Sequence, residues 1–164
     1  MIRNVTPSDI PAIAAIYNHY ILQSVATFEV EPLSLDEMQE RIADISAHCP
    51  YLVYEADGHV AGYCYAHPWK ERAAYRHTFE TTVYVDPAWQ RQGIGRALME
   101  RLIEECRRRG CYVLIACITG GNEGSCQLHR ELGFRQASCF HGVGEKFGRR
   151  LDVVDWELEL VEHA

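Results

Sequence analysis

Residues 90–97, which read Gln-Arg-Gln-Gly-Ile-Gly-Arg-Ala, have the residue types and the spacing of a loop that binds a pyrophosphate. Backbone N–H groups beside Gly93 and Gly95 can point at an anion because no Cβ obstructs them, and the helix that follows adds a partial positive charge. Arg91 and Arg96 add full charges. The segment has neither the Lys-Ser/Thr pair of a P-loop nor the three glycines of the dinucleotide fingerprint. A pattern this short also occurs by chance, so the alternative is an ordinary turn before a helix.

The elements around this loop follow from the spacing of apolar residues. The helical spacing of apolar residues predicts four helices. The first follows a Thr-Pro-Ser-Asp cap at 6–9, and the second follows a capping box at Ser34. The third spans 95–109, and the fourth runs from the end of a loop at 118–123 to Leu132. Strands are predicted at 2–5, 51–56, 59–66, 78–85, 112–117, 135–143 and 151–160, with turns at 57–58 and 145–150. This order predicts an α/β (α+β) fold with a mixed central sheet of about seven strands flanked by about four helices.

Composition and charge exclude several classes of protein. The 164 residues are 48% hydrophobic and 24% charged, which fits a single globular domain over 1–164. The net charge of −7 disfavours nucleic acid and anionic membranes as partners, and the arginines at 107–109 are explained by the negative end of a helix dipole. No apolar stretch is long enough for a membrane span and the first residues lack a signal peptide, so we expect a cytoplasmic protein.

The cysteines predict neither a disulfide framework nor a metal site. Their number, seven, is odd, and the chain has no C-x-x-C motif and no paired His/Cys ligand spacing. We interpret them as reduced thiols in the core or on the surface. A single activated cysteine acting as a nucleophile remains an alternative, although no residue marks one out.

Two motifs give the chain a family resemblance. Residues 90–97 resemble motif A of the GNAT (Gcn5-related) N-acetyltransferases, in which this loop holds the pyrophosphate of acetyl-CoA. Residues 122–134 resemble motif B, in which an Asn at the helix start bonds the pantetheine arm and the helix ends in Gly-Phe. Further segments resemble the phosphinothricin and methionine sulfoximine N-acetyltransferase branch, so the resemblance covers essentially the whole chain; these segments are 16–18, 27–28, 80–85, 128–129 and 144–149.

The resemblance implies a GNAT fold with acetyl-CoA as cosubstrate and no metal. In the family the pantetheine arm lies along the strand at 82–85, whose backbone N–H groups would meet the oxyanion of the reaction. The coenzyme contacts that we expect on this basis are Val83, Tyr84, Val85, Arg91, Gln92, Gly93, Ile94, Gly95, Arg96, Asn122, Gly124, Ser125 and His129.

Glu80 is the expected catalytic base. Attack of a primary amine on a thioester requires removal of an ammonium proton, stabilisation of a tetrahedral oxyanion and help for the leaving thiolate. The matching acid is the proposed base in the family, and strand alternation places Glu80 on one face with Thr82 and Tyr84. The alternative for Glu80 is a solvated carboxylate on an edge strand.

His129 lies four residues before Gly133, where many GNAT enzymes have a tyrosine that reprotonates the thiolate. A histidine is usual at this position in the phosphinothricin-like branch, and the resemblance implies either that same catalytic role or only a hydrogen bond to the sulfur or the pantetheine. An ordinary imidazole is mostly neutral at pH 7 and is a weaker source of protons. The alternative is a polar helix residue without a catalytic role.

The implied acceptor is a small amino-acid-like amine that carries a carboxylate and further acceptor oxygens. Arg76 is the expected clamp for these groups, since the family has an arginine in a similar place. Phe28 is expected to contact the substrate beside Glu80, and Trp69 and Tyr75 are further candidates for the pocket wall. The alternative for these aromatic residues is ordinary core packing.

Lys146 and Arg149 lie in a turn that resembles the Lys-Phe-Gly-Arg motif of the family. The sequence leaves four alternatives for both residues: contact with a coenzyme phosphate, contact with the substrate, contact with a partner subunit, or a solvated turn without such a role. A homodimer is implied by the resemblance alone.

We therefore expect an N-acetyltransferase that moves acetyl from acetyl-CoA to the α-amine of phosphinothricin, methionine sulfoximine or methionine sulfone by direct attack in a ternary complex. One alternative is an acetyltransferase for peptide N-termini or polyamines, which would need a more open groove. Another alternative is a non-catalytic acetyl-CoA-binding sensor, in which Glu80 would not matter.

Overall fold

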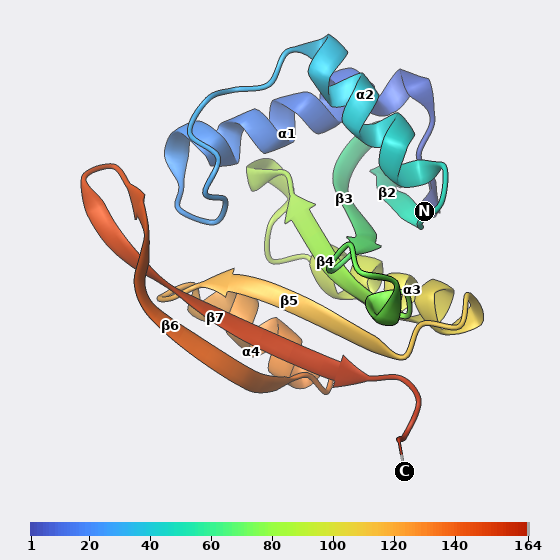
Figure 1. Ribbon diagram of the computed structural model, residues 1–164. Coiled ribbons are helices and arrows are strands. Elements are labelled where there is room, and N and C mark those ends of the chain that lie inside the picture. Colours follow the sequence, from blue (N-terminus) through green and yellow to red (C-terminus); the bar gives the residue numbers. More distant parts are fainter. Residues whose placement is uncertain (164) are drawn as a thin grey trace.

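The computed structural model describes residues 1–163 and contains one mixed sheet (Figure 1). The seven strands follow the order β1-β2-β3-β4-β5-β7-β6 across the sheet. Their bounds are β1 Ile2–Asn4, β2 Tyr51–Ala56, β3 His59–Pro68, β4 Thr78–Val85, β5 Val113–Thr119, β6 Arg135–Lys146 and β7 Arg149–Glu159. The helices are α1 Ile10–Gln23, α2 Leu35–Ser46, α3 Ile94–Arg108 and α4 Glu123–Glu131, with 3₁₀ turns at Pro7–Asp9, Ala73–Tyr75 and Pro87–Trp89.

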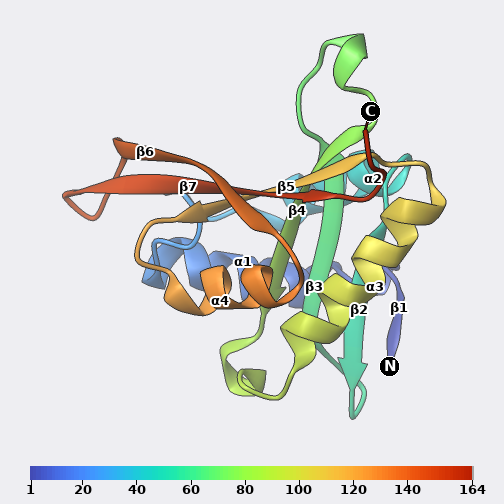
Figure 2. The ribbon, with the colours of Figure 1, turned by 90° about the horizontal axis from the view of Figure 1, so that it is seen from below.

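The helices cover the two faces of the sheet in pairs (Figures 1 and 2). One core cluster joins α1 and α2 to one face, and it includes Ile13, Met38 and Tyr63. A second cluster joins α3 and α4 to the other face, and it includes Leu98 and Trp156. Each helix buries the apolar stripe that its sequence period predicts, because that stripe excludes the most water when it faces the sheet.

The sheet separates at its centre, between β4 and β5. These strands form the parallel pair of the sheet, and their register runs only from Thr78 opposite Val113 to Glu80 opposite Ile115. Beyond Glu80 the edge of β4 that faces β5 leaves the ladder, while its other edge stays paired with β3 up to Val85. The backbone groups on that edge are therefore available to a bound group.

The predicted fold class is confirmed, and the main difference lies in the last hairpin. The strands β6 and β7 reach Lys146 and Arg149, so the turn is residues 147–148 and not the longer 145–150 segment. Phe147 at φ 53° and Gly148 at φ 69° give both central residues positive φ, as a tight primed hairpin turn requires. Each of the seven cysteines is a free thiol. Within residues 1–163 no helix has the length and apolar character that a membrane crossing needs.

Candidate active site

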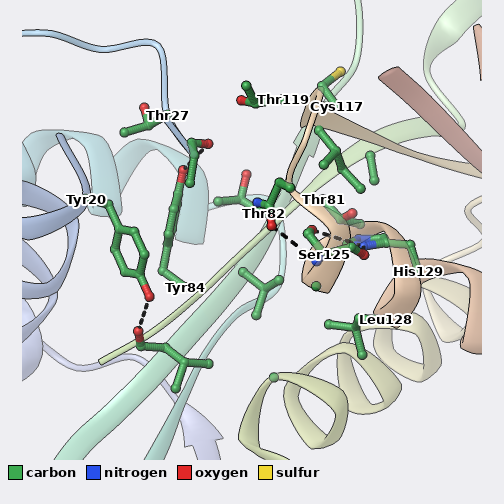
Figure 3. Close-up of a pocket in the computed structure, with 18 of the residues that line it drawn as sticks. Tyr20, Thr27, Thr81, Thr82, Tyr84, Cys117, Thr119, Ser125, Leu128 and His129 are labelled. Carbon is green, nitrogen blue, oxygen red and sulfur yellow. Dashed lines mark hydrogen bonds between the residues drawn. The ribbon is translucent and has the colours of Figure 1, made fainter. Parts of the chain in front are cut away.

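A cleft of about 770 Å³ occupies the space that opens between β4 and β5. It is lined from both faces of the sheet (Figure 3). Thr82 and Tyr84 face the side of α1, where Tyr84 stacks on Tyr17 with ring centroids 5.3 Å apart. Gly95 on α3 and Ser125 on α4 line the opposite side. The cleft therefore runs through the plane of the sheet, so two molecules can meet in it from opposite faces.

The start of α3 forms one end of the cleft. Gly93 is the N-cap residue with φ 78°, and Arg91 is also left-handed with φ 60°. A Cβ on Gly95 would lie 3.6 Å from Val85 and 3.7 Å from Leu128, which shows how closely α3 approaches β4 and α4. The first N–H groups of a helix have no partner within it, so they can bind an anion here.

The charges at this end are unequal. Arg96 lines the cleft, but its guanidinium pairs with Glu131 and lies 3.6 Å from Glu100. Arg91 lines the cleft without an ion pair to any residue within 1–163, so its charge is the more available one. Gln92 belongs to the same loop but does not line the cleft.

The start of α4 is held by Asn122. Its Oδ1 accepts a hydrogen bond from the Ser125 N–H at 3.3 Å and caps the helix. Asn122, Gly124, Ser125 and His129, which are expected to contact the coenzyme, all line the cleft. With Oδ1 engaged in the cap, Asn122 offers its amide N–H₂ to a bound group.

His129 is buried on α4 with only 3% of its surface exposed. Its Nδ1 lies 2.8 Å from the Ser125 carbonyl oxygen (Figure 3). A carbonyl oxygen only accepts, so Nδ1 carries the proton and the neutral ring has its lone pair on Nε2. Burial lowers the pKa of His129, and the bond to Ser125 opposes this only in part. At neutral pH the imidazole therefore holds no spare proton.

Glu80 lies where the two central strands separate. It is the last β4 residue in register with β5, and its side chain keeps 27% of its surface exposed. The carboxylate Oε2 is 3.8 Å from Nε2 of His67 on the neighbouring strand β3. A carboxylate that is accessible and free of a permanent strong cation can accept a proton from a bound ammonium group.

Cys117 on β5 lines the cleft, although no motif in the sequence distinguishes it from the other cysteines. Burial raises the pKa of the Cys117 thiol, and the carboxylates of Glu80 and Asp155 raise it further. The thiol is therefore protonated at neutral pH, which makes it a poor nucleophile. This disfavours covalent catalysis by the one cysteine that is exposed to the centre of the cleft.

The loop between α1 and α2 closes the side of the cleft that faces α1. Three successive carbonyl groups of this loop accept hydrogen bonds from three strands: Val25 from Thr119 at 2.6 Å, Ala26 from Tyr84 at 3.5 Å and Thr27 from Lys146 at 2.8 Å. Residues 25–27 are thus fixed by β5, β4 and β6. No local pattern indicates this, because all three donors are distant in the sequence.

Phe28 continues the loop and lines the cleft, as predicted. It packs on Gly144 so closely that a Cβ there would lie 2.3 Å from the phenyl ring. Beside it Lys146 is 3% exposed, so the solvated alternative for this residue is wrong. Burial lowers the pKa of Lys146, while the nearby Glu29 carboxylate opposes the shift. Arg149, by contrast, is exposed.

Arg76 does not line the cleft in this chain. It is exposed, and its Nη1 donates to the carbonyl of Ala73 at 3.3 Å. Trp69 and Tyr75 do not line the cleft either; they pack edge to face at 5.4 Å beneath Lys70. All of these residues belong to the connection between β3 and β4, which extends beyond the end of the sheet (Figure 2).

Tyr20 is a second lining residue that was not expected from the sequence. Its hydroxyl donates to the Val85 carbonyl at 2.5 Å (Figure 3). The same hydroxyl accepts from the Gln90 side-chain amide at 3.0 Å. It thereby ties α1 to the end of β4 and to the loop before α3. Tyr20 follows Tyr17 at helical spacing, which is the only sequence signal for it.

Comparisons with known proteins agree with this geometry. The model of the Acetyltransferase (GNAT) family matches residues 13–134. A phosphinothricin N-acetyltransferase of Alcaligenes faecalis is 43% identical over 155 residues, covering 93% of this chain and 79% of the relative. An L-methionine sulfoximine/L-methionine sulfone acetyltransferase of Salmonella typhimurium is 40% identical over 167 residues, covering 99% and 96%.

A solved structure of a GNAT superfamily phosphinothricin acetyltransferase from Sinorhizobium meliloti, in complex with acetyl-CoA, superposes with a TM-score of 0.94. It is 35% identical, and the match covers 97% of this chain and 87% of that one. Sequence, fold and cleft together show that this chain belongs to the GNAT family of acetyltransferases, in the branch of the phosphinothricin and methionine sulfoximine N-acetyltransferases.

Proposed function

We propose that this chain, acting as one domain over residues 1–164, transfers acetyl from acetyl-CoA to the α-amine of a small amino-acid-like acceptor. Phosphinothricin, methionine sulfoximine and methionine sulfone are the acceptors that the relatives' names support. The observation that carries the proposal is the cleft through the sheet, with an anion-binding helix start at one end and the Glu80 carboxylate at its centre.

The coenzyme side of the proposal uses the helix starts. The free N–H groups at the start of α3, with Gly93, Gly95 and Arg91, would hold the pyrophosphate. The pantetheine arm would lie along the open edge of β4 at 83–85, where the backbone groups lack a strand partner on that side. The donors on α4 would bind its amides. A backbone N–H on the same edge of β4 would meet the oxyanion.

Glu80 is the general base in this proposal. The acceptor amine enters from the side of α1, over the loop that contains Phe28, and transfers its ammonium proton to the carboxylate, directly or through one water. The neutral amine then attacks the thioester carbon, and the C–S bond breaks as the tetrahedral intermediate collapses. Base and thioester meet in one cleft, so the reaction needs no covalent enzyme intermediate.

Two roles are expected for His129, which are protonation of the leaving thiolate and a hydrogen bond to the sulfur or the pantetheine, and we assign it only the hydrogen bond. Because its pKa is lowered and its Nδ1 proton is committed to Ser125, the ring cannot supply a proton to the leaving thiolate at neutral pH. It shapes the thioester end of the cleft and offers the Nε2 lone pair to a donor. The attacking nitrogen carries a surplus proton once it is bonded to the thioester carbon, and this proton passes through water to the leaving thiolate.

The assembly and the location of the protein complete the proposal. The family resemblance supports a homodimer that acts on a small-molecule amine and binds neither nucleic acid nor a membrane, in keeping with the net charge of −7. The seven free thiols favour a reducing compartment, which we take to be the cytoplasm. Arg76 remains a predicted clamp for the acceptor carboxylate, although it lies outside the cleft of its own chain.

The proposal is tested by acetyl transfer to a panel of amines, followed by mass spectrometry of the product. The panel holds phosphinothricin, methionine sulfoximine, methionine sulfone, plain amino acids, spermidine and short peptides. Glu80→Gln should lower kcat about 100-fold or more, the usual effect of removing a general base, while acetyl-CoA binding stays unchanged. Glu145→Gln, an exposed carboxylate on β6, is the matched control and should have no effect.

Each outcome has a distinct meaning. If acetyl is transferred only to peptides or polyamines, the proposed acceptor class is wrong and the proposed acetyl transfer is still supported. If the protein binds acetyl-CoA but acetylates no amine, and Glu80→Gln leaves that binding unchanged, the chain is a non-catalytic sensor and not an enzyme.

A further inference from the structure

Three metal-ligand side chains meet on the hairpin of β6 and β7, outside the cleft. Cys139 Sγ lies 3.9 Å from His141 Nδ1, and this nitrogen lies 3.5 Å from Asp152 Oδ2. The three ligand atoms are all within 4.8 Å of one another. Cys139 and His141 are exposed, so an ion can reach them from solvent.

This cluster lies on the sheet face opposite the acceptor loop. Cys139 is in register with Val154, whereas the next residue, Phe140, is in register with Val153, which lines the cleft. Strand alternation therefore directs Cys139 away from the cleft and toward the face that carries α4. A ligand at this cluster would not occupy the coenzyme or acceptor space.

The distances suit a tetrahedral ion. Zinc binds Cys sulfur at about 2.3 Å, His nitrogen at about 2.0 Å and carboxylate oxygen at about 2.0–2.2 Å, so neighbouring ligand atoms of a tetrahedral site are about 3.3–3.5 Å apart. The sulfur-to-nitrogen separation of 3.9 Å exceeds such an edge by about 0.4 Å, the nitrogen-to-oxygen separation of 3.5 Å matches one, and the sulfur lies within 4.8 Å of the carboxylate oxygen. Rotation of the exposed side chains closes that gap and leaves a fourth position for water.

The backbone holds the carboxylate ligand in place. The register shifts between Phe140 and Gly144, and in this bulge Gly142 adopts φ 60° and donates its N–H to Asp152 Oδ1 at 2.7 Å. The other carboxylate oxygen, Oδ2, faces the imidazole of His141.

One cation lies nearby. The guanidinium of Arg150 donates from Nε and Nη2 to the Gly142 carbonyl at 3.2 Å each, and so lies against the bulge. A Cys thiolate and the Asp152 carboxylate supply two negative charges against this one positive charge. Binding releases the thiol proton to solvent, since the thiolate is the metal ligand.

We propose that Cys139, His141 and Asp152 form a binding site for a borderline divalent cation of the zinc type. A thiolate, an imidazole and a carboxylate are the donor set that such an ion accepts. The bound ion would close a loop between residues 139 and 152 and fix the bulge. Because the Asp152 carbonyl accepts the Gly120 N–H at 2.8 Å, it would also stiffen the connection from β5 to α4.

The sequence expectation is that the cysteines bind no metal, and this proposal departs from it. Cys139 and His141 are only two positions apart, and one strand can supply both. The third ligand comes from the next strand, and only the shifted register of the hairpin brings it within reach. A search for paired Cys/His spacings cannot detect such a set.

The test is titration of the metal-free, reduced protein with Zn²⁺ in competition with a chromophoric chelator. We expect one Zn²⁺ per chain, and Cys139→Ser, His141→Gln and Asp152→Asn should each weaken binding at least about tenfold. Asp152→Asn keeps the oxygen that accepts from Gly142, so the bulge is retained. Cys117→Ser removes the other exposed thiol and is the matched control, with binding unchanged.

Substitution by Co²⁺ gives a second readout. A thiolate-to-cobalt charge-transfer band should appear with the native protein and with Cys117→Ser, and should be absent in Cys139→Ser. The proposal is overturned if Zn²⁺ does not bind, if the three variants bind as tightly as the native protein, or if the band follows Cys117. Circular dichroism of each variant checks that the fold is intact, and Asp152→Asn decides the outcome if a larger change unfolds the hairpin.

Discussion

Replacing Lys146 with Met tests how the acceptor side of the cleft is held. The ammonium group donates to the Thr27 carbonyl at 2.8 Å and is buried beneath the loop that contains Phe28. Met has a similar length and fills the same space, but it donates no hydrogen bond. The loop then keeps its contacts to Thr119 and Tyr84 and loses the one from β6.

The size of the effect follows from two opposing contributions. A hydrogen bond from a charged donor contributes about 1.5–3 kcal/mol, and a buried carbonyl left without a donor adds to the loss. Removing the ammonium also removes the cost of burying its charge, so we take the lower part of that range, about 1.5–2 kcal/mol. Since about 1.4 kcal/mol corresponds to a factor of ten, the acceptor KM should rise about 10–30-fold.

The assay separates the two substrates. Steady-state kinetics with the preferred acceptor should show the rise in its KM, while the Kd of acetyl-CoA stays within about twofold, because Lys146 contacts none of the expected coenzyme residues on β4, α3 and α4. Hydrogen exchange should become faster at the amides of residues 25–29. Arg149→Met removes a positive charge from the same hairpin at an exposed position and should change neither quantity.

Two results would refute this reasoning. An acceptor KM within about twofold of the native value, with faster exchange in the loop, would show that loop order does not limit acceptor binding. An equal loss of coenzyme affinity would show that Lys146 supports the whole cleft and not its acceptor side.

Two further predictions concern residues at the start of α3 and within α4. Gly93→Ala places a Cβ where φ is 78° and no neighbour obstructs it, so backbone strain alone should lower the free energy of unfolding by about 1–2 kcal/mol. Gly124→Ala lies in a helix with open space around it and should raise the free energy of unfolding by up to about 1 kcal/mol. Urea unfolding of both variants measures the two changes. His129 has a lowered folded pKa, so as the pH falls below the ordinary value of about 6.5 the unfolded chain takes up a proton that the folded one does not, and stability declines. His129→Gln should flatten that decline in thermal unfolding between pH 7 and pH 5, whereas replacing the exposed His59 should not; an unchanged slope in His129→Gln would contradict the assignment of a buried neutral ring.

Much of the architecture could be predicted from the sequence because it rests on local chemistry. The capping box at Ser34 closes as predicted, with Glu37 bonding back to the cap residue. Gly93 and Gly110 take positive φ at the start and just beyond the end of α3, where few other residues fit. Asp57-Gly58 forms the hairpin turn between β2 and β3. Such signals are carried by a few neighbouring residues, so they need no knowledge of the rest of the chain.

Most of the expected coenzyme positions also line the cleft, because one strand-loop-helix unit and one helix start supply them. Gln92 and Arg76 were expected at the site and do not line it. A residue type predicts a chemical capacity, whereas the direction of a side chain depends on how its loop packs. Arg76 follows a 3₁₀ turn that bonds it to Ala73, and nothing in its neighbours' identities predicts that.

The place where the two substrates can meet depends on packing between segments that are distant in the chain. The separation of β4 and β5 after Glu80, the burial of Lys146 under residues 25–27 and the meeting of Cys139 with Asp152 all join segments that are distant in the chain. Each depends on strand register, and a shift of one residue would turn these side chains to the opposite face. The family, the local elements and the available chemical groups can be predicted from the order of the amino acids, because they are properties of short segments. Their assembly into one cleft is a property of the packed sheet.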